Sequence, residues 1–152
     1  MTTGRVNGEE VTVEEVTEAT PDVAAAFSRL VPQLSRSSAV PTGSELAEMV
    51  ASAATVVLFA RDDGGEIVGT LTLALFRIPT GVRAWIEDVV VDEGARGAGV
   101  GEALTRAALE RTGAAGARTV DLTSRPSREA ANRLYRRLGF EPRDTTVYRY
   151  SV

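Results

Sequence analysis

Apolar residues recur along this chain first with a period of two residues and later with a period near 3.6. Alternating or continuous apolar runs predict strands over 11–18, 55–60, 66–78 and 83–91. Only short turns rich in Asp, Gly or Pro separate the last three runs. These three strands are therefore expected to pair in sequence as an antiparallel meander.

Helical spacing of apolar residues defines four further stretches. Thr20 and Pro21 form a typical helix start, and Ser44 leads a shorter apolar stretch. Ser127 is expected to cap the last helix. The predicted helices cover 22–31, 45–53, 101–116 and 128–139, and strands are expected over 118–124 and within 140–150.

The order of these elements predicts a mixed α/β sheet flanked by helices. A strand, a helix and a strand follow one another between residues 85 and 122, which makes the strands 85–91 and 117–122 parallel neighbours. A chain of 152 residues has the typical length of one domain. It is large enough to bury about 70% of the surface that the unfolded chain exposes. We expect a single domain over 1–152 whose residues 1–10 are flexible.

Absent residue types exclude much chemistry. The chain has no Cys, no His and no Lys, so disulfides, thiolate nucleophiles, imidazole ligands and Schiff-base lysines are excluded. No metal site is expected. Proton transfer must fall to Asp, Glu, Tyr or water.

Charge is unevenly distributed over a chain of net charge −4. Residues 1–70 hold 11 acidic residues and 4 arginines, whereas residues 71–152 hold 10 acidic residues and 13 arginines. The segment 116–143 favours an anionic ligand, although a solvated helix face also explains several of its arginines. The acidic total and the few aromatic residues argue against a nucleic-acid partner.

No apolar stretch reaches the roughly 18 residues that a membrane span requires. The first residues, MTTGRVNGEE, lack the basic and apolar layout of a secretory signal. A cytoplasmic protein with no membrane partner is the expectation.

The stretch VVVDEGARGAGVG, residues 89–101, joins a strand to a helix through a loop with four glycines. Backbone amides and the positive end of the helix meet there, which favours binding of an anion. A Walker A loop is excluded because there is no lysine. A dinucleotide fingerprint lacks its third glycine, because Glu102 stands there, although Asp121 lies at the distance of a ribose-binding acid. A glycine loop that served only as a structural turn would not explain the presence of Arg96.

RGAGVG at 96–101 resembles the motif [QR]-x-x-G-x-[GA] of the GCN5-related N-acetyltransferase (GNAT) superfamily. AANRLYRRLGF at 130–140 resembles the second signature of that family, an Asn followed by a Tyr and then by Gly-Phe. The resemblance extends from about Val56 to Tyr150. It implies the acyl-CoA N-acyltransferase (GNAT) fold, in which the sheet splays apart at its centre between two parallel strands.

The resemblance also implies roles for individual residues. The pantetheine arm of acetyl-CoA would pair with the strand edge from Val89 to Val91, and Asn132 would bond this arm. Tyr135 would protonate the departing thiolate, although a core aromatic is the alternative. The pyrophosphate would be held with the help of Arg96 by the loop residues Gly97, Ala98, Gly99, Val100 and Gly101.

Glu87 stands where several members of this superfamily place a catalytic residue, and it is the expected general base. Strand alternation puts Trp85, Glu87 and Val89 on one face and Ile86, Asp88 and Val90 on the other. A solvated acidic pair or an ion pair with an arginine is the alternative for Glu87 and Asp88.

Two functions follow from this resemblance. The first is an N-acetyltransferase that moves the acetyl group of acetyl-CoA directly to a primary amine of a small molecule or peptide, in a ternary complex. The second is a noncatalytic CoA-binding or nucleotide-binding module of the same fold. An NAD-type oxidoreductase is a minor third reading, and a homodimer is compatible with either main function.

Overall fold

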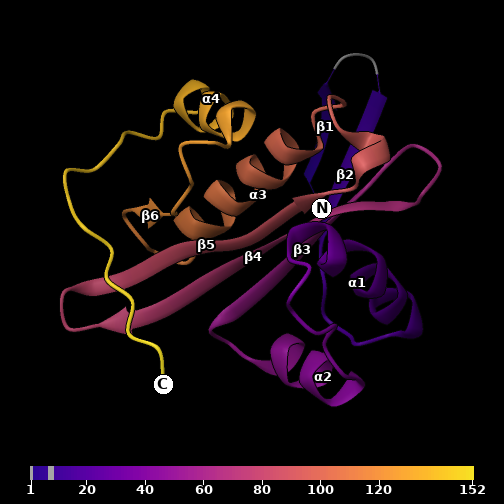
Figure 1. Ribbon diagram of the computed structural model, residues 1–152, viewed down its shortest axis with the longest axis horizontal. Coiled ribbons are helices and arrows are strands. Elements are labelled where there is room, and N and C mark those ends of the chain that lie inside the picture. The colour runs from indigo at the N-terminus through magenta and orange to yellow at the C-terminus, as the bar shows by residue number, and fades with distance from the viewer. Residues whose placement is uncertain (1, 7–8) are drawn as a thin grey trace. The chain divides into compact units, whose positions relative to one another are not determined.

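The computed structural model describes residues 2–6 and 9–152 (Figure 1). The chain divides into two units, Met1–Leu122 and Thr123–Val152. The first unit contains β1 (Thr2–Val6), β2 (Glu9–Glu15), α1 (Pro21–Leu34), α2 (Gly43–Ala51), β3 (Thr55–Arg61), β4 (Ile67–Ile78), β5 (Gly81–Val91), the 3₁₀ turn η1 (Glu93–Ala95), α3 (Val100–Ala114) and β6 (Val120–Asp121). The second unit contains α4 (Glu129–Arg137).

The described strands form one sheet in the order β1-β2-β3-β4-β5-β6. β3, β4 and β5 pair antiparallel as the meander that the short turns predicted. β5 and β6 are parallel, and only two residue pairs join them, Ala84 with Val120 and Trp85 with Asp121. The mixed sheet and its single parallel crossover agree with the predicted fold class.

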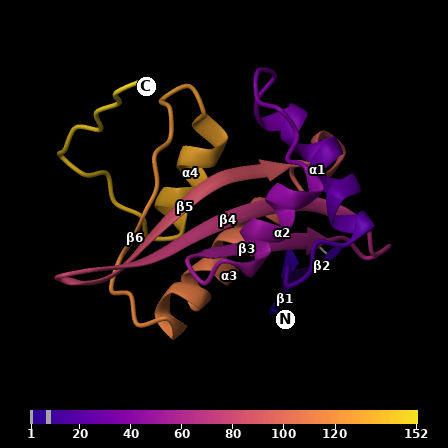
Figure 2. The same ribbon diagram turned by 90° about the horizontal axis from the view of Figure 1, so that it is seen from below.

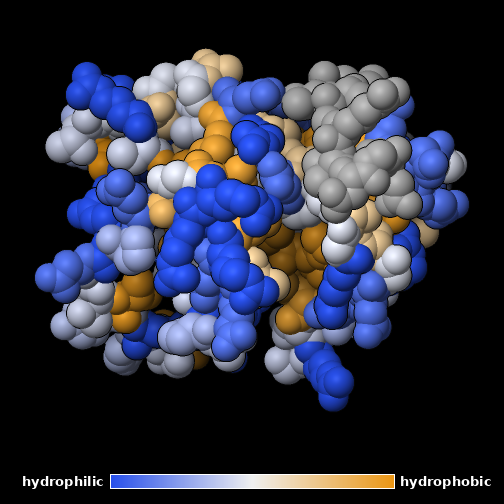
Figure 3. Space-filling model, turned by 90° about the horizontal axis from the view of Figure 1, so that it is seen from above, coloured by the Kyte–Doolittle hydropathy of each residue, from blue (hydrophilic) through white to orange (hydrophobic). Residues whose placement is uncertain are grey.

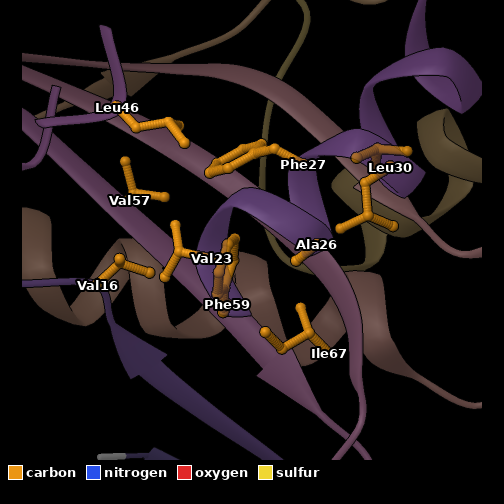
Figure 4. Close-up of a cluster of buried hydrophobic side chains, with 10 residues drawn as sticks. Val16, Val23, Ala26, Phe27, Leu30, Leu46, Val57, Phe59 and Ile67 are labelled. Carbon is orange, nitrogen blue, oxygen red and sulfur yellow. The ribbon is translucent and has the colours of Figure 1, made fainter. Parts of the chain in front are cut away.

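Helices cover both faces of this sheet within the first unit. α1 and α2 lie on one face and α3 on the other (Figures 1 and 2). The core under α1 and α2 is apolar, with Leu30 and Phe59 fully buried (Figure 4). The rings of Phe27 and Phe59 lie 5.2 Å apart and tilted by 52°. Each fully buried side chain of this size contributes about 1.5 to 3 kcal/mol, so this cluster fixes α1 on the sheet.

Glycine at position 69 of β4 allows α3 to pack closely on the opposite face. A Cβ atom at Gly69 would lie 2.7 Å from Val100 Cγ1 and 3.1 Å from Leu104 Cδ1. The first distance is shorter than real Cβ contacts and the second is tighter than most of them, so a larger residue at this position would require Val100 or the start of α3 to shift. This contact positions the start of α3.

The helix starts follow from local capping. The Thr20 hydroxyl accepts the N–H of Val23, and Pro21 occupies the first turn, as the sequence predicted. α2 starts earlier than predicted, because Thr42 and Glu45 form a capping box and Ser44 lies inside the helix. The reciprocal bonds of a capping box satisfy two donors, whereas Ser44 alone would satisfy one.

The N-terminal strands differ from the prediction. The first predicted strand, 11–18, is observed as β2 over 9–15, and a further strand β1 precedes it, with Thr2 opposite Val13. The expectation that residues 1–10 are flexible covers residues 1, 7 and 8, which lie outside the described residues. Strand β1 has a weak pattern of its own and forms through pairing with β2.

The second unit corrects two further predictions. Ser127 does not cap α4: its N-cap is Arg128, which makes no side-chain cap bond. The strands expected within 140–150 are absent, because residues 138–152 contain no helix or strand. Alternating Thr, Val and Tyr residues favour a strand, but a strand also requires a paired neighbour, and the second unit contains no strand that could pair with this segment.

Hydrophilic and hydrophobic residues are interspersed on the face shown in Figure 3. Among the described residues, the exposed large apolar side chains are Val40, Phe76, Val147, Tyr148, Tyr150 and Val152. Four of these six lie in the last six residues. No described helix is long and apolar enough to cross a membrane.

Candidate functional site

The glycine loop connects the end of β5 at Val91 to the start of α3 at Val100. Gly97 and Gly99 have positive φ angles of 84° and 79°, a conformation that other residues rarely adopt. A Cβ atom at Gly97 would meet nothing within 4 Å, so the space beside this backbone is open. These glycines therefore allow both the turn and a close approach to it.

The start of α3 is suited to an anion. Its N-cap is Gly99, and no side chain caps the helix. The first-turn amides of an α-helix have no partner inside the helix, so those of Val100 and Gly101 remain available as donors. They coincide with the positive end of the helix dipole, and the exposed Arg96 adds a full positive charge nearby.

One edge of β5 is open beside this loop. Within the first unit, β6 pairs with β5 only at Ala84 and Trp85. The N–H of Asp92 donates to the carbonyl of Val68 on β4 at 2.8 Å. Backbone groups alternate in direction along a strand, so the N–H and C=O of Val91 point away from β4, toward the open edge. This edge can accept a further extended segment.

A β-bulge interrupts β5 just before that edge. Thr70 of β4 pairs with Val90, whereas Thr72 pairs with Glu87, so β5 contains one extra residue between these pairs. Asp88 lies in the bulge with φ 48°. It is the only non-glycine residue with positive φ among the described residues. Positive φ costs a non-glycine residue free energy, which indicates a locally constrained backbone.

The bulge changes which β5 side chains share a face. Because Thr70 and Thr72 lie on the same face of β4, their partners Val90 and Glu87 also share a face. Regular alternation predicts Val90 and Glu87 on different faces of the sheet. This prediction is wrong because of the extra residue in β5. Val90 belongs to the core under α1, so Glu87 lies on the α1 side of the sheet. Glu87 and Asp88 are exposed, and neither forms an ion pair with a described residue.

Side chains of α1 contact the segment that leads into the glycine loop. The Arg29 guanidinium donates to Asp92 Oδ2 and to the carbonyl of Ile67, the latter at 2.7 Å. The N–H of Glu93 donates to Gln33 Oε1 at 2.9 Å. The sequence prediction missed these contacts, because more than 60 positions separate Arg29 from Asp92 and no local pattern marks them.

The Asp121 carboxylate forms an ion pair with an arginine. The carboxylate lies 3.6 Å from the Arg83 guanidinium, on the neighbouring strand. An acid that binds a ribose would need a free carboxylate, so this ion pair weakens the dinucleotide reading of the glycine loop.

The second unit carries the other candidate residues, Asn132 and Tyr135, on α4. A spacing of three residues places them on neighbouring positions of one helix face. Asn132 donates from Nδ2 to the carbonyl of Arg125 at 3.0 Å, which leaves its Oδ1 without a protein donor among the described residues. The Tyr135 ring lies 5.6 Å from the Phe140 ring, and the N–H of Phe140 donates to the carbonyl of Tyr135 at 2.9 Å.

Tyr135 is 9% exposed, and its hydroxyl bonds to no described residue. Burial raises the pKa of this hydroxyl above its ordinary value of 10, and the positive charge of Arg128 opposes the shift. Desolvation disfavours the phenolate, so Tyr135 keeps its proton at neutral pH. A protonated phenol without a protein acceptor can give its proton to a ligand.

The candidate residues therefore fall into two groups. Glu87, Val89, Val91, Arg96, Gly97, Ala98, Gly99, Val100 and Gly101 lie together on β5, the glycine loop and α3. Asn132 and Tyr135 lie together on α4. Among the described residues, no group of three or more acidic residues is arranged to hold a metal ion.

Comparisons with known proteins place the chain in context. The sequence model of the acetyltransferase (GNAT) family matches residues 25–140. An acetyltransferase from Trypanosoma brucei is 27% identical, with a TM-score of 0.76, over 93% of this chain and 99% of that one. A putative acetyltransferase from Agrobacterium tumefaciens is 25% identical, with a TM-score of 0.81, over 92% and 99%. No curated protein sequence matches significantly.

More distant structures share the fold. Glucosamine-6-phosphate N-acetyltransferase from Arabidopsis thaliana is 21% identical, with a TM-score of 0.76, and the match covers 92% of this chain and 97% of that one.

Proposed function

Because the chain belongs to the acetyltransferase (GNAT) family, we propose that it transfers the acetyl group of acetyl-CoA directly to a primary amine. The acceptor is a small molecule or a peptide. The observation that carries this proposal is the uncapped start of α3, with two positive-φ glycines, directly beside the open edge of β5.

The chain's own groups fit acetyl-CoA. The pyrophosphate would accept hydrogen bonds from the amides between Gly97 and Gly101, with the charge of Arg96 added. The pantetheine amides would pair with the outward N–H and C=O of Val91, and with the backbone of Val89, as an added strand would. Asn132 would bond the same arm through its side-chain amide. When bound, acetyl-CoA supplies an activated acetyl group as a thioester.

Glu87 would prepare the acceptor. Alkyl amines are protonated near neutral pH, and an exposed carboxylate both attracts the ammonium and removes its proton, directly or through one water. The amine nitrogen then forms a bond to the thioester carbon while the carbon–sulfur bond breaks. Glu87 passes the ammonium proton to solvent, and it then accepts the second proton that the nitrogen loses as the amide forms.

Tyr135 would complete the transfer. Its hydroxyl gives a proton to the departing sulfur, so coenzyme A leaves as a neutral thiol, and the phenolate regains a proton from solvent. Tyr135 carries its proton at neutral pH, as a donor must, and burial raises its pKa further. A direct transfer of this kind needs no nucleophile from the protein, which agrees with the absence of cysteine from the sequence.

The choice of an amine acceptor is supported by the distant structural neighbours. The Arabidopsis protein acts on glucosamine 6-phosphate, by its name, and a further neighbour of 16% identity is AAC(6')-Iy in complex with a CoA-linked acetylneamine analogue. Both ligands carry amines on sugar rings. Amino sugars therefore belong in the acceptor panel beside simple amines, amino acids and peptides.

The direct test measures release of free thiol from acetyl-CoA with that panel. We expect thiol release that depends on at least one amine and yields the acetylated amine by mass spectrometry. Binding of acetyl-CoA without transfer to any amine would instead support the noncatalytic CoA-binding module. A rise in melting temperature with NAD but not with coenzyme A would contradict both.

A further inference from the structure

Two side chains of α1 hold the beginning of the glycine loop from outside. Arg29 bonds to Asp92 and also to the carbonyl of Ile67 at 2.7 Å, so its two guanidinium nitrogens bridge the loop and β4. Gln33, one turn further along α1, accepts the N–H of Glu93 at 2.9 Å. The cluster of apolar side chains described above fixes α1 itself on the sheet. The loop is therefore anchored to a rigid element.

Asp92 transmits this anchor to the turn that follows it. Its Oδ1 accepts the N–H of Gly94 at 3.3 Å, and its backbone carbonyl accepts the N–H of Ala95 at 2.9 Å. Its own N–H bonds to β4 through Val68. The position of the Asp92 carboxylate therefore determines the shape of the 3₁₀ turn η1.

Beyond this turn, two backbone hydrogen bonds within the loop are long. The N–H of Arg96 lies 3.5 Å from the carbonyl oxygen of Glu93, and that of Ala98 lies 3.3 Å from the carbonyl oxygen of Ala95. These distances exceed those of good hydrogen bonds. The direction in which Arg96 and the loop amides point consequently depends on the turn before them.

Arg29 also changes the net charge beside the glycine loop. Asp92 and Glu93 place two negative charges immediately before a loop suited to an anion. Such charges would repel a phosphate. The guanidinium of Arg29 neutralises Asp92, while the Asp92 carboxylate still caps the turn.

We propose that Arg29 is a positioning residue for cofactor binding: through Asp92 it fixes the turn that aims the glycine loop, and it removes a charge that opposes phosphate. This inference rests on the proposed function, because the ligand of the loop is taken to be the pyrophosphate of acetyl-CoA. Arg29 itself does not contact the cofactor in this account.

The test is calorimetric titration of coenzyme A into the wild-type protein and the Arg29→Gln variant. Arg61→Gln is the matched control, because Arg61 bonds to Asp22 at the other end of α1 and to Glu14, away from the loop. We expect Arg29→Gln to raise the Kd about tenfold and the control to leave it unchanged. Unfolding temperatures should fall to a similar extent in both variants.

A double-mutant cycle separates positioning from general destabilisation. Asp92→Asn keeps the cap on Gly94 but removes the charge that Arg29 neutralises. If the two residues act together, Arg29→Gln weakens binding far less in the Asp92→Asn background than alone. Arg29→Lys, which keeps the charge but cannot bridge two acceptors in the same way, should lie between wild type and Arg29→Gln.

Four outcomes are distinguishable. An unchanged Kd in Arg29→Gln, or fully additive effects with Asp92→Asn, would overturn the role of Arg29. An increase in Kd equal to that caused by Arg61→Gln would also overturn it, since both substitutions would then weaken binding through stability alone. If the wild-type protein does not bind coenzyme A, the proposed function itself fails, whatever the variants do.

Discussion

The two groups of candidate residues are built in different ways. The group around the glycine loop consists mainly of backbone: amides, positive-φ glycines and an open strand edge, held between the sheet and α1. The group on α4 consists of two side chains on a nine-residue helix. Among residues 123–152, all of them described, only Tyr135 is buried.

This difference separates binding from chemistry. Backbone donors on a rigid sheet hold a ligand whose shape does not change during reaction, and their removal requires a change of backbone conformation. A side-chain hydroxyl can be removed without altering the backbone. Substitutions in the first group should therefore alter cofactor affinity, and substitutions on α4 should alter turnover.

The largest effect is expected for Gly99→Val. Valine at a φ of 79° is strained, and its branched side chain would occupy the approach to the first amides of α3. We expect coenzyme A to lose its stabilisation of the protein, measured as a thermal shift, with affinity reduced about 100-fold or more. Gly43→Val is the control, because Gly43 lies in α2, away from the loop, and has no positive φ and open space at its Cβ position. Normal binding by Gly99→Val would remove the loop from the site.

Tyr135→Phe should have the next largest effect, and on turnover alone. The substitution removes one hydroxyl while the ring still packs against Phe140. Loss of a general acid should lower kcat about 100-fold, with the Kd of coenzyme A unchanged. Tyr150→Phe, at a tyrosine that is 90% exposed, is the control. Equal kcat values for Tyr135→Phe and wild type would make Tyr135 a core residue only.

The pH profile extends this test. A group that must donate a proton is active below its pKa and inactive above it, and burial raises the pKa of Tyr135 above 10. We expect that the hydroxyl causes no loss of kcat between pH 7 and pH 10. An alkaline decline of kcat in this range that disappears in Tyr135→Phe would show a lowered pKa and contradict the role of burial.

Arg96→Ala should weaken binding moderately. A charge-assisted hydrogen bond to a phosphate contributes a few kcal/mol at most, and the exposure of Arg96 reduces this to roughly 1 to 2 kcal/mol. The Kd should rise and kcat should remain the same, which is the reverse of the Tyr135→Phe pattern. Arg118→Ala, at an exposed arginine after α3, serves as the control. A kcat effect without a Kd effect would place Arg96 in the chemistry.

The smallest effect is expected for Glu87→Gln, because high pH can replace a base. We expect kcat/KM to fall about tenfold at neutral pH and to recover partly at high pH, where free amine is abundant. Asp88→Asn tests the neighbouring carboxylate, and asparagine tolerates the φ of 48° at this position. If Asp88→Asn is the slower enzyme, the two residues exchange roles. If both variants keep the wild-type pH profile, neither carboxylate acts as base.

The sequence predicted the parts of the fold that local patterns determine. The meander from β3 to β5, the helix start at Thr20 and the glycine loop before α3 all follow from periodicity, capping residues and turn composition. The prediction of strands after Phe140 is wrong, and strand β1 was not predicted. Both errors arise because a strand depends on a partner that lies elsewhere in the chain.

In the candidate site, the glycine loop could be predicted from the sequence, but the bulge before it and the side chains that hold it in place could not. The bulge at Asp88 consists of one extra residue, which leaves no mark on a run of apolar and acidic residues. Arg29 and Gln33 bond to Asp92 and Glu93, which lie 60 or more positions away in the chain. Such contacts follow from packing of α1 on β5, not from any motif.

The central claim is that the backbone from Gly97 to Gly101 binds the pyrophosphate of acetyl-CoA. Amide hydrogen exchange of the wild-type protein, measured with and without saturating coenzyme A, tests it most directly. The claim predicts slower exchange of the amides of Gly99, Val100 and Gly101 when coenzyme A is bound, together with the outward amide of Val91. Unchanged exchange at these amides under saturation, with protection elsewhere, would contradict it.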